Sequence, residues 1–390
     1  MLLNCLFGLR RRAGRFLLPL LLLAAACAAL PLQARAIDTE AQEAFMVDFD
    51  TGAVLLEKNP DQLMHPSSMS KMMTVYLLFE RLKNGSVKLD DEFPVSEKAW
   101  RMGGSKMFVP LGGKIRVEDL IRGIVIQSGN DACIVVAEGL GGNEEAFAAE
   151  MTRRAHELGM TNSTFKNATG WPDPDHLTTA RDLALLAKRT ITDFPEYYHY
   201  YGELEFTFNK IKQGNRNPLL YKDMGADGLK TGHTEQGGYG VTASAKRGDR
   251  RLILVVNGLP SMKERAAESE RLMEWGFREF DNYSLFKAGD TVTDADVWLG
   301  DAATVPLAIG SDLKVTLPKK SRHDMKVKAV FDGPIPAPIK KGDQIAKLVI
   351  AAPDMAPMEV PLVAGADIGR LGFVGRIGAA IKHIVWGSVQ

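Results

Sequence analysis

The sequence predicts an α/β domain, with one sheet covered by a cluster of helices, followed by a small all-β domain and a C-terminal amphipathic helix. Strand-like runs at both ends of a helical segment indicate the sheet. After about Asn282 the helical spacing gives way to short β-rich runs between Gly, Pro and Asp turns. We therefore expect the first domain over 37–281, the second over 282–365 and the helix over 366–390.

The first 36 residues have the features of a cleavable secretory signal. Arginines precede the apolar stretch Phe16 to Leu30, and Ala34-Arg35-Ala36 supplies small residues at a cleavage site. This stretch is short for a membrane-spanning helix, which needs about 20 apolar residues. We expect cleavage after Ala36. The alternative is a lipoprotein site at Cys27, but it lacks the Leu expected three residues earlier, where Ala24 stands.

Length, net charge and cysteine count limit the kinds of protein that this chain can be. Removal of 36 of the 390 residues leaves 354, more than one hydrophobic core usually fills. The leader contains five of the 48 basic residues and none of the 48 acidic ones, so 43 basic residues remain and the net charge is −5. That balance gives no support for nucleic-acid binding. Cys133 is the only cysteine after the leader, so no internal disulfide can form, and its apolar neighbours predict a buried side chain.

Two hairpins and several helices are expected in the first domain. Residues 44–57 alternate around a turn at Asp50-Thr51-Gly52. Tyr239–Lys246 and Arg251–Asn257 flank a turn at Gly248-Asp249. Helical spacing predicts helices between the two hairpins and after the second. These helices cover Ser68–Leu82, 116–127, 131–140, 143–158, 178–192 and about Glu268–Phe277.

The second domain and the tail differ from the first in pattern. The β-rich runs predict strands over Thr291–Leu299, Leu313–Leu317, Met325–Phe331, Gln344–Ile350 and Met358–Val363. In the last 25 residues, apolar side chains share one helical face and basic ones lie on the other. Such a helix suits a membrane surface, and its abundant Gly weakens helicity more in water than at a membrane. Docking of the helix on its own protein is the alternative.

A serine followed three residues later by a lysine can place a nucleophile and a proton acceptor on one helix face. The chain contains four such pairs, beginning at Ser68, Ser163, Ser284 and Ser311. Only Ser68 opens a strongly apolar helix, where the helix N-terminus adds an exposed amide and positive potential. We therefore predict Ser68 as a nucleophile and Lys71 as its base.

Two rarer motifs follow along the chain. Ser128-Gly129-Asn130 lies between two predicted helices, where a loop can present both polar side chains to a cleft. Lys230-Thr231-Gly232 precedes the second hairpin, and on a strand it offers a cation, a hydroxyl and open backbone to an extended peptide. Alone, the first is equally compatible with a helix cap and the second with a turn. The three motifs in this order and spacing predict serine–lysine acyl transfer.

With these motifs, the chain resembles the serine D-alanyl-D-alanine carboxypeptidases of peptidase family S11, among the low-molecular-mass penicillin-binding proteins. The resemblance covers essentially the whole chain after the leader. It implies a transpeptidase domain like that of penicillin-binding proteins and β-lactamases, with an antiparallel sheet and a helical cluster, then the all-β domain and the amphipathic tail. The family-like segments are Pro66–Thr74, Ser128–Cys133, Gln213–Asn217, Asp227–Thr234 and Trp275–Arg278.

The resemblance implies the catalytic roles. Ser68 attacks the carbonyl between the two terminal D-alanines of a peptidoglycan stem peptide and becomes acylated. Lys71 accepts its proton and must be neutral, which burial and the nearby Lys230 charge would favour. Ser128 and Lys230 relay the proton to the departing D-alanine.

The resemblance also implies the binding roles. Asn130 orients the peptide amide, and Thr231 and Arg265 hold the terminal carboxylate. The backbone N–H groups of Ser68 and of His233, directly after Gly232, form the oxyanion hole. The His233 side chain is expected to tune the site, with a merely structural role as the alternative.

The implied partners are peptidoglycan stem peptides, β-lactams as covalent inhibitors at Ser68, and a membrane surface at 366–390. No cofactor or metal is implied, because the seven His residues show no metal-type spacing. Export and the amphipathic tail place the protein in the periplasm, on the outer face of the inner (cytoplasmic) membrane.

Four alternatives share part of this pattern. A class A β-lactamase needs a Glu-x-x-Leu-Asn segment, which the region between 131 and 229 lacks. An endopeptidase needs the same groups, but the β-domain and tail favour a carboxypeptidase. A β-lactam sensor needs a spanning segment, and after the leader no stretch reaches about 18 apolar residues. The complete set of motif residues disfavours an inactive scaffold.

Overall fold

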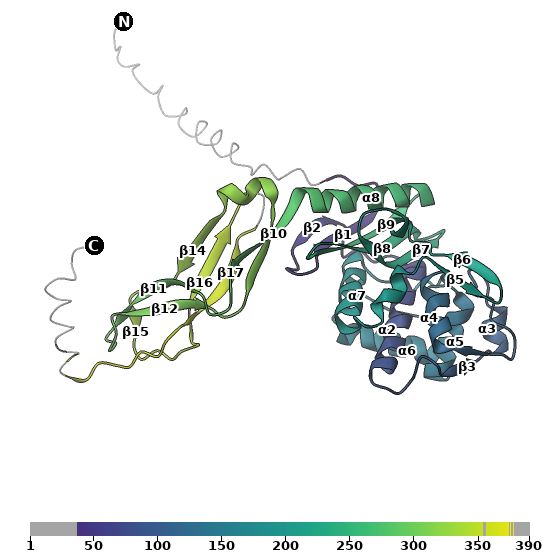
Figure 1. The fold of residues 1–390 in the computed structure, drawn as a ribbon, viewed down its shortest axis with the longest axis horizontal. Helices are drawn as coiled ribbons and strands as arrows, with labels where there is room; N and C mark the ends of the chain where they lie inside the picture. Colours follow the sequence, from purple (N-terminus) through teal and green to yellow (C-terminus); the bar gives the residue numbers. More distant parts are fainter. Residues whose placement is uncertain (1–36, 354–355, 374, 376, 378–390) are drawn as a thin grey trace, which may run out of the picture. The chain divides into compact units, whose positions relative to one another are not determined.

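The computed structural model describes residues 37–353, 356–373, 375 and 377. The predicted leader and most of the predicted C-terminal helix lie outside these residues. The first domain contains a five-stranded antiparallel sheet of order β2-β1-β9-β8-β7 (Figure 1). Its strands are β1 (Glu43–Asp48), β2 (Val54–Lys58), β7 (Ala226–Thr234), β8 (Gly238–Arg247) and β9 (Arg250–Leu259).

Helices cover both faces of this sheet. Figure 1 shows α8 across one face and the other helices gathered against the opposite face. Alternation along β9 sends Ile253 and Val255 into the core beneath the helical cluster, whereas Leu252 lies beside Gly276 of α8. The helices are α2 (Lys71–Lys83), α3 (Glu97–Arg101), α4 (Val117–Val125), α5 (Asn130–Gly141), α6 (Glu144–Glu157), α7 (Ala180–Asp193) and α8 (Met262–Glu279).

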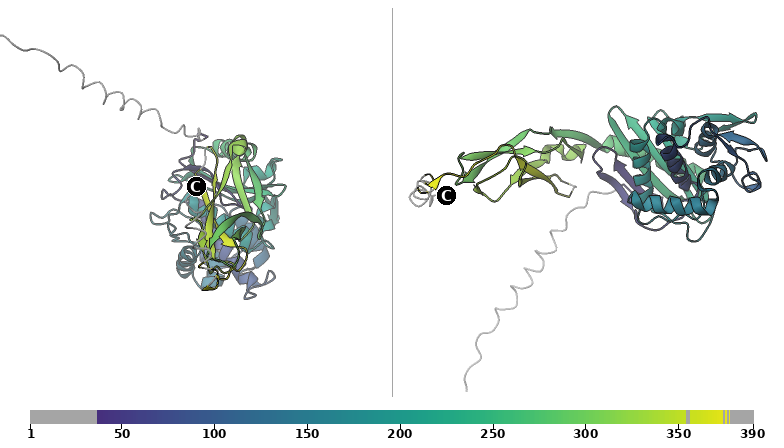
Figure 2. Two further views of the ribbon diagram at one scale, coloured as in Figure 1. Left: turned by 90° about the vertical axis from the view of Figure 1, so that its left-hand side faces the viewer. Right: turned by 90° about the horizontal axis from the view of Figure 1, so that it is seen from below.

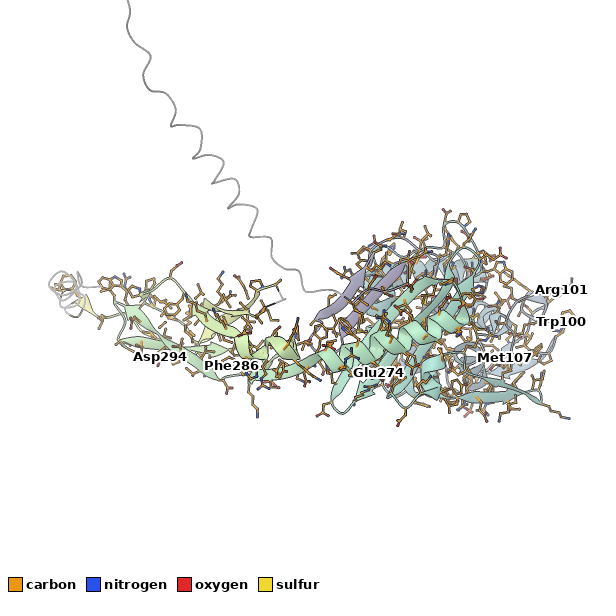
Figure 3. All side chains as sticks on the ribbon, turned by 90° about the horizontal axis from the view of Figure 1, so that it is seen from above. Trp100, Arg101, Met107, Glu274, Phe286 and Asp294 are labelled. Atoms are coloured by element: carbon orange, nitrogen blue, oxygen red, sulfur yellow. The ribbon has the colours of Figure 1, made fainter. Side chains whose placement is uncertain are left out.

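Short elements complete this domain. Two small hairpins pair β3 (Glu92–Pro94) with β4 (Lys114–Arg116) and β5 (Glu205–Phe208) with β6 (Ile211–Gly214). An ion pair holds α8 against the sheet: Arg247 Nη1 of β8 donates to Glu274 Oε2 at 3.0 Å (Glu274 is labelled in Figure 3).

The second domain is formed by strands. Its six-stranded sheet has the order β14-β16-β17-β12-β11-β15, and β10 pairs with β13 (Figure 2). The core includes Val305, Leu307, Val315, Leu348 and Leu362, all fully buried. The strands are β10 (Phe280–Phe286), β11 (Thr291–Trp298), β12 (Thr304–Ile309), β13 (Leu313–Pro318), β14 (Lys326–Val330), β15 (Ile335–Pro336), β16 (Gln344–Ala351) and β17 (Met358–Ala364).

A buried ion pair ties the sheet to the chain that follows it. Arg250 Nε donates to Asp48 Oδ2 at 3.0 Å, and neither side chain is more than 10% exposed. Arg250 Nη1 donates to the carbonyls of Gly276 at 3.2 Å and Phe280 at 2.7 Å. Asp48 Oδ1 accepts from Asn282 Nδ2 at 3.1 Å. The pair therefore links β1 and β9 to the end of α8 and the start of β10.

Most of the expected elements are present, but one differs in its bounds and several others were not expected. The last helix of the first domain begins at Met262, not Glu268, because Ser261 caps it and accepts from Glu264 N–H at 3.1 Å. Strands β10 and β12 were not expected, because β10 mixes polar and apolar residues without strict alternation and Pro306 interrupts β12. Helix α3 and the short strands β3, β4, β5, β6 and β15 were not expected either. Among the helices that can be described, none is both long and apolar enough to cross a membrane.

Candidate active site

Ser68 lies in a short 3-10 turn, Ser67–Ser70, that leads into α2, and not in α2 itself as expected. Ser68 Oγ accepts a hydrogen bond from Lys71 Nζ at 2.8 Å. The same Nζ donates to the Thr169 carbonyl at 2.5 Å. Ser68 is half-buried, whereas Lys71 is completely buried. The turn thus presents the hydroxyl to solvent and keeps the amine beneath it.

The pKa of Lys71 is lowered to about 8: burial is the main cause and nearby Arg216 adds to it, against the opposing effects of Cys133 and Asp131. Within the described residues, no carboxylate lies at ion-pair distance from Lys71. An amine without a counter-ion in a dry site loses its proton more easily than one in water. A useful fraction of Lys71 is therefore neutral near pH 7 and can accept a proton from Ser68.

Lys230 lies on β7 and is almost fully buried. Its Nζ donates to the Thr231 carbonyl at 3.1 Å. Burial lowers the pKa of Lys230 well below its ordinary value, and repulsion from Lys71 lowers it further. Lys71 thus lowers the pKa of Lys230, whereas Lys230 is not among the groups that shift the pKa of Lys71, so the expected effect of the Lys230 charge on Lys71 stays a prediction.

The loop between α4 and α5 carries the second motif. Ser128 adopts a φ of +65°, and Gly129 N–H donates to the Gly123 carbonyl at 2.8 Å. Asn130 Nδ2 donates to the Gly103 carbonyl at 2.9 Å. Ser128 Oγ is buried, and no described group bonds to it. The Ser128 hydroxyl is thus free to exchange a proton with a bound substrate.

Asp131 was not predicted as a site residue, yet it shapes the cleft. Its carboxylate accepts from the backbone N–H groups of Met107 and Phe108, each at 2.8 Å, and of Val109 at 3.2 Å. These bonds fold the segment after Gly104 against the start of α5. An acidic residue in the first turn of a helix was the available signal, but its partners are distant in sequence.

The predicted site residues line two connected halves of one cleft. The first half, of about 450 Å³, includes Ser68, Ser128, Thr231, Gly232, His233 and Arg265. The second, of about 440 Å³, also contains Ser68 and His233, together with Asn130. Lys71 and Lys230 lie buried beneath. The structure therefore brings all three motifs together although more than 150 residues separate the first from the last.

Cations gather in the first half. Arg265 comes from α8 and is buried, and its Nε has no partner among the described residues. Arg216 lines the same half, and its Nη1 donates to Ser105 Oγ at 2.5 Å. The His233 ring stacks on Tyr239 with centroids 3.8 Å apart. This half can therefore bind an anionic group, such as a peptide carboxylate.

Sequence reasoning missed some of these contributors. Arg216 belongs to a segment already noted as family-like, so a signal for it existed. The Thr169 carbonyl and Trp171 gave none, because their proximity to Lys71 and Ser68 arises only from the fold. Cys133 is buried, as predicted, and burial raises the pKa of its thiol to about 12, so the thiol stays neutral.

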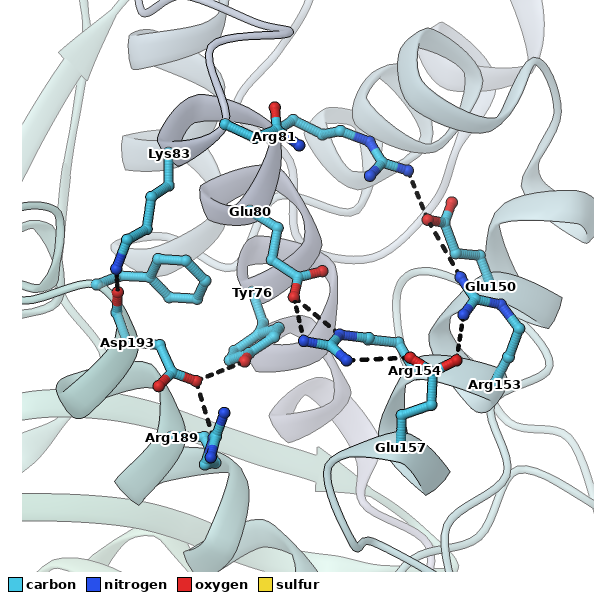
Figure 4. A pocket seen from close by; sticks show the side chains of 12 residues that line it. Tyr76, Glu80, Arg81, Lys83, Glu150, Arg153, Arg154, Glu157, Arg189 and Asp193 are labelled. Carbon is cyan, nitrogen blue, oxygen red and sulfur yellow. Dashed lines mark hydrogen bonds and ion pairs between the residues drawn. The ribbon is translucent and has the colours of Figure 1, made fainter.

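A larger hollow of about 610 Å³ lies between the end of α2, α6 and α7 (Figure 4). Its arginines pair with carboxylates, for example Arg81 with Glu150 and Arg189 with Asp193. It contains no serine or cysteine beside a base. Among the described residues, no cluster of three His, Cys, Asp or Glu side chains is arranged to hold a metal ion. The chemistry therefore points to the cleft around Ser68.

Comparison with known proteins identifies the family. A sequence profile described as D-alanyl-D-alanine carboxypeptidase matches residues 30–261. The chain belongs to this family. A second profile, the C-terminal domain of penicillin-binding protein 5, matches residues 280–370. The expected fold class, a transpeptidase domain followed by an all-β domain, is confirmed for these two regions.

Individual relatives match this carboxypeptidase in sequence and structure over most of its length. It is 38% identical to the D-alanyl-D-alanine carboxypeptidase DacA of Haemophilus influenzae, over 86% of this chain and 87% of the relative. It is 39% identical to DacC of Escherichia coli, over 89% and 88% of the two chains. The solved penicillin-binding protein 5 of H. influenzae matches with a TM-score of 0.78, covering 86% of this chain and all of that one. The predicted carboxypeptidase activity and β-lactam binding are thereby confirmed.

Proposed function

We propose that this carboxypeptidase works through an acyl-enzyme on Ser68, at the outer face of the cytoplasmic membrane. The observation that carries the mechanism is the 2.8 Å contact between Lys71 Nζ and Ser68 Oγ. The amine is buried, has a pKa lowered to about 8, and faces the one half-exposed hydroxyl of its turn. A nucleophile beside a neutral base is what acyl transfer requires.

Acylation begins when neutral Lys71 accepts the proton of Ser68 Oγ. The oxygen attacks the carbonyl carbon of the penultimate D-alanine of a peptidoglycan stem. The negative charge moves to the carbonyl oxygen, where the backbone N–H groups of Ser68 and His233 stabilise it. Collapse of this intermediate breaks the C–N bond and leaves an ester on Ser68.

The departing D-alanine needs a proton on its nitrogen. We assign its delivery to Ser128, whose free hydroxyl lines the same half of the cleft, with Lys230 and Lys71 as the proton source. Arg265 and Thr231 hold the carboxylate of that D-alanine, and Asn130 orients the preceding amide. Neutral Lys71 then activates water, which hydrolyses the ester and releases the shortened stem.

A β-lactam follows the same first step, because its strained amide replaces the peptide bond. Attack by Ser68 opens the ring, and the amine stays attached to the acyl group, so no leaving group departs. The same acyl-enzyme therefore accounts for substrate turnover and for covalent inhibition.

The location rests on the two ends of the sequence. Residues 1–36 are a candidate cleavable leader, and 366–390 a candidate amphipathic helix. We infer that the protein is exported to the periplasm and held peripherally on the outer face of the inner membrane. Trimming pentapeptide stems to tetrapeptides there would limit later cross-linking.

The mechanism is tested with the purified exported protein in detergent. D-alanine release from a pentapeptide ending in D-Ala-D-Ala is measured beside Ser68→Ala, and the residue labelled by a fluorescent penicillin is located by mass spectrometry. Release and a label on Ser68, both lost in the variant, support the mechanism. A label on another residue, or release by Ser68→Ala, would refute it.

The location is tested by expressing the full chain in a Gram-negative host. Terminal sequencing of the product should begin at Ile37, and fractionation should recover it with the inner membrane. Deletion of 366–390 should release it into the soluble periplasmic fraction. A product that retains residue 1 in the cytoplasm, or membrane recovery unchanged by the deletion, would contradict the respective part.

A further inference from the structure

His176 is a buried histidine outside the three motifs, and it contacts the turn that carries the nucleophile. It lies between Gly170 and α7 and is only 2% exposed. Its Nε2 lies 2.8 Å from Ser70 Oγ, which in turn donates to the Ser67 carbonyl at 2.8 Å. Ser67 and Ser70 are buried as well. A chain of hydrogen bonds therefore leads from His176 to the peptide bond that precedes Ser68.

The hydrogen bonds of His176 fix which ring nitrogen carries the proton. The Lys166 backbone N–H donates to Nδ1 at 3.2 Å, so Nδ1 carries no proton. Burial lowers the pKa of His176 to about 4, so the ring is neutral near pH 7. The one ring proton is therefore on Nε2, which donates to Ser70 Oγ. The Ser70 hydroxyl then has its own proton for the Ser67 carbonyl, and each donor of the chain has an acceptor.

Packing holds this chain in place. Gly170 has a φ of +77°, and a Cβ atom there would lie 1.8 Å from the Ser67 carbonyl oxygen and 3.0 Å from Ser70 Oγ. The backbone at Gly170 therefore lies directly against the bond between Ser70 and Ser67. The Phe165 ring meets the His176 ring edge to face, with centroids 5.4 Å apart. The position of the imidazole is thus set by packing as well as by its hydrogen bonds.

Ser67 has a backbone conformation that needs such support. Its φ is +51°, in the left-handed region that is unfavourable for a residue with a side chain. Ser67 Oγ bonds to Thr234 Oγ1, at the end of β7, at 2.9 Å. The Ser67 carbonyl accepts from Ser70 Oγ. Because strained backbone persists only where its surroundings fix it, these two contacts hold Ser67 by its side chain and by its carbonyl.

The Ser67 carbonyl and the Ser68 N–H belong to one planar peptide unit. In a trans unit the two groups point in opposite directions. The carbonyl points toward buried Ser70, so the Ser68 N–H points the other way, toward the cleft that Ser68 lines. A hydrogen bond accepted by the carbonyl fixes this plane and also polarises the N–H. The chain from His176 therefore acts on one of the two donors assigned to the oxyanion hole.

We propose that His176 is a positioning residue, which acts through Ser70 to fix the peptide plane whose N–H at Ser68 stabilises the oxyanion. His176 touches neither the substrate nor the reacting atoms. The role rests on the acyl transfer at Ser68 proposed above. An oxyanion donor acts mainly when negative charge develops on the carbonyl oxygen, so loss of the imidazole should lower kcat and leave KM almost unchanged.

Variants of the purified exported protein in detergent test this role by D-alanine release. Loss of a whole oxyanion donor costs about 10²-fold to 10³-fold, so a tilted donor in His176→Met should cost about thirtyfold in kcat. Ser70→Ala should cost about as much. The double variant should lose no more than the larger single loss, because both residues act in one chain. His176→Gln should stay within about threefold of wild type, since an amide can both accept from Lys166 N–H and donate to Ser70 Oγ.

Nuclear magnetic resonance of wild type with isotope-labelled histidine tests the chain without any substitution. The His176 signals are those that His176→Gln removes, and they should show the ring proton on Nε2 at pH 7. This measurement and Ser70→Ala decide the proposal even if His176→Met does not fold. A proton on Nδ1, or on both nitrogens, would overturn the proposal.

His156→Met is the matched control, because His156 is an exposed histidine of α6 whose Nε2 lies 2.9 Å from the Ser163 carbonyl. It should keep the wild-type kcat. An unchanged kcat in His176→Met, equal losses in His176→Met and His176→Gln, or fully additive losses with Ser70→Ala would each overturn the role of His176. Failure of wild type itself to release D-alanine would instead refute acyl transfer at Ser68.

Discussion

Two regions of the catalytic domain are rich in charged side chains, and they differ in whether each cation has a counter-charge. In the hollow formed by α2, α6 and α7, each arginine faces a carboxylate (Figure 4). In the cleft, Lys71, Lys230, Arg216 and Arg265 face no carboxylate within the described part of the chain. Compensated charge adds stability and fixes helices relative to one another. Uncompensated charge is kept at a cost because a substrate or a reaction uses it.

The largest expected effect is at Lys71. Lys71→Met should lower D-alanine release and penicillin labelling by about 10³-fold, because it removes the base. Its free energy of unfolding should change by no more than about 1 kcal/mol, since a buried cation without a counter-ion contributes little stability. The rates of D-alanine release and penicillin labelling are measured by kinetics, and the free energy of unfolding by urea titration. Lys83→Met, on the same helix, is the control and should retain activity. A large stability loss in Lys71→Met would break the comparison.

The next largest effect concerns Asp48 and Arg250. This ion pair is also compensated, like those of the hollow, but it is almost fully buried. Asp48→Asn should cost about 3 kcal/mol in urea unfolding, because it leaves a buried guanidinium without a counter-charge. Activity per folded molecule should stay unchanged. Asp50→Asn, two residues on and more exposed, should cost much less. Equal costs for the two variants would show that burial of the pair is not decisive.

The third prediction concerns pH. Because Lys71 must be neutral to act and its pKa is lowered to about 8, kcat/KM should rise about tenfold from pH 6 to pH 7 and level off above pH 8. The unfolded chain binds this proton more tightly than the folded one. Stability should therefore increase with pH between about 8 and the ordinary lysine value near 10.4. A rate that is flat from pH 6 to pH 9 would exclude Lys71 as the base.

The smallest effect belongs to the paired hollow. Arg154 bonds Glu80 and Glu157, with the Arg154 and Glu80 side chains 28% and 21% exposed. Arg154→Met should cost about 1 kcal/mol of stability and leave activity unchanged. Arg153→Met, at a more exposed position, should cost less. Loss of D-alanine release in Arg154→Met would show that the hollow contributes to activity, and would contradict the view that its paired charges serve stability alone.

Local patterns explain why much of the site could be predicted. Ser68 and Lys71 are three residues apart, so their contact follows from helical geometry even though the first turn is a 3-10 turn. Contacts between distant segments could not be predicted in this way. The bond from Lys71 to Thr169 and the placement of Arg216 beside Ser105 depend on how loops pack after folding.

The secondary structure shows the same difference between elements that follow from local patterns and elements that depend on distant contacts. Hairpins and amphipathic helices carry their own period, so β1, β2, β8, β9 and most helices were expected. Strand β10 was missed because its mostly half-buried residues mix polar and apolar side chains, and the strand is ordered by pairing with β13 and not by a pattern of its own. The helix α8 starts earlier than its apolar period indicates, because a cap and not a core contact sets its first residue.

The contact between Gly170 and the Ser67 carbonyl constrains how the enzyme can evolve under antibiotic selection. Any side chain at position 170 must separate the loop from the turn, since its first carbon would lie 1.8 Å from that oxygen. The same movement would draw the Thr169 carbonyl away from Lys71. Drug escape by substitution of Gly170 would thus weaken the cell-wall reaction itself. A substitution at Trp171, which is exposed and lines the cleft, does not meet this steric barrier.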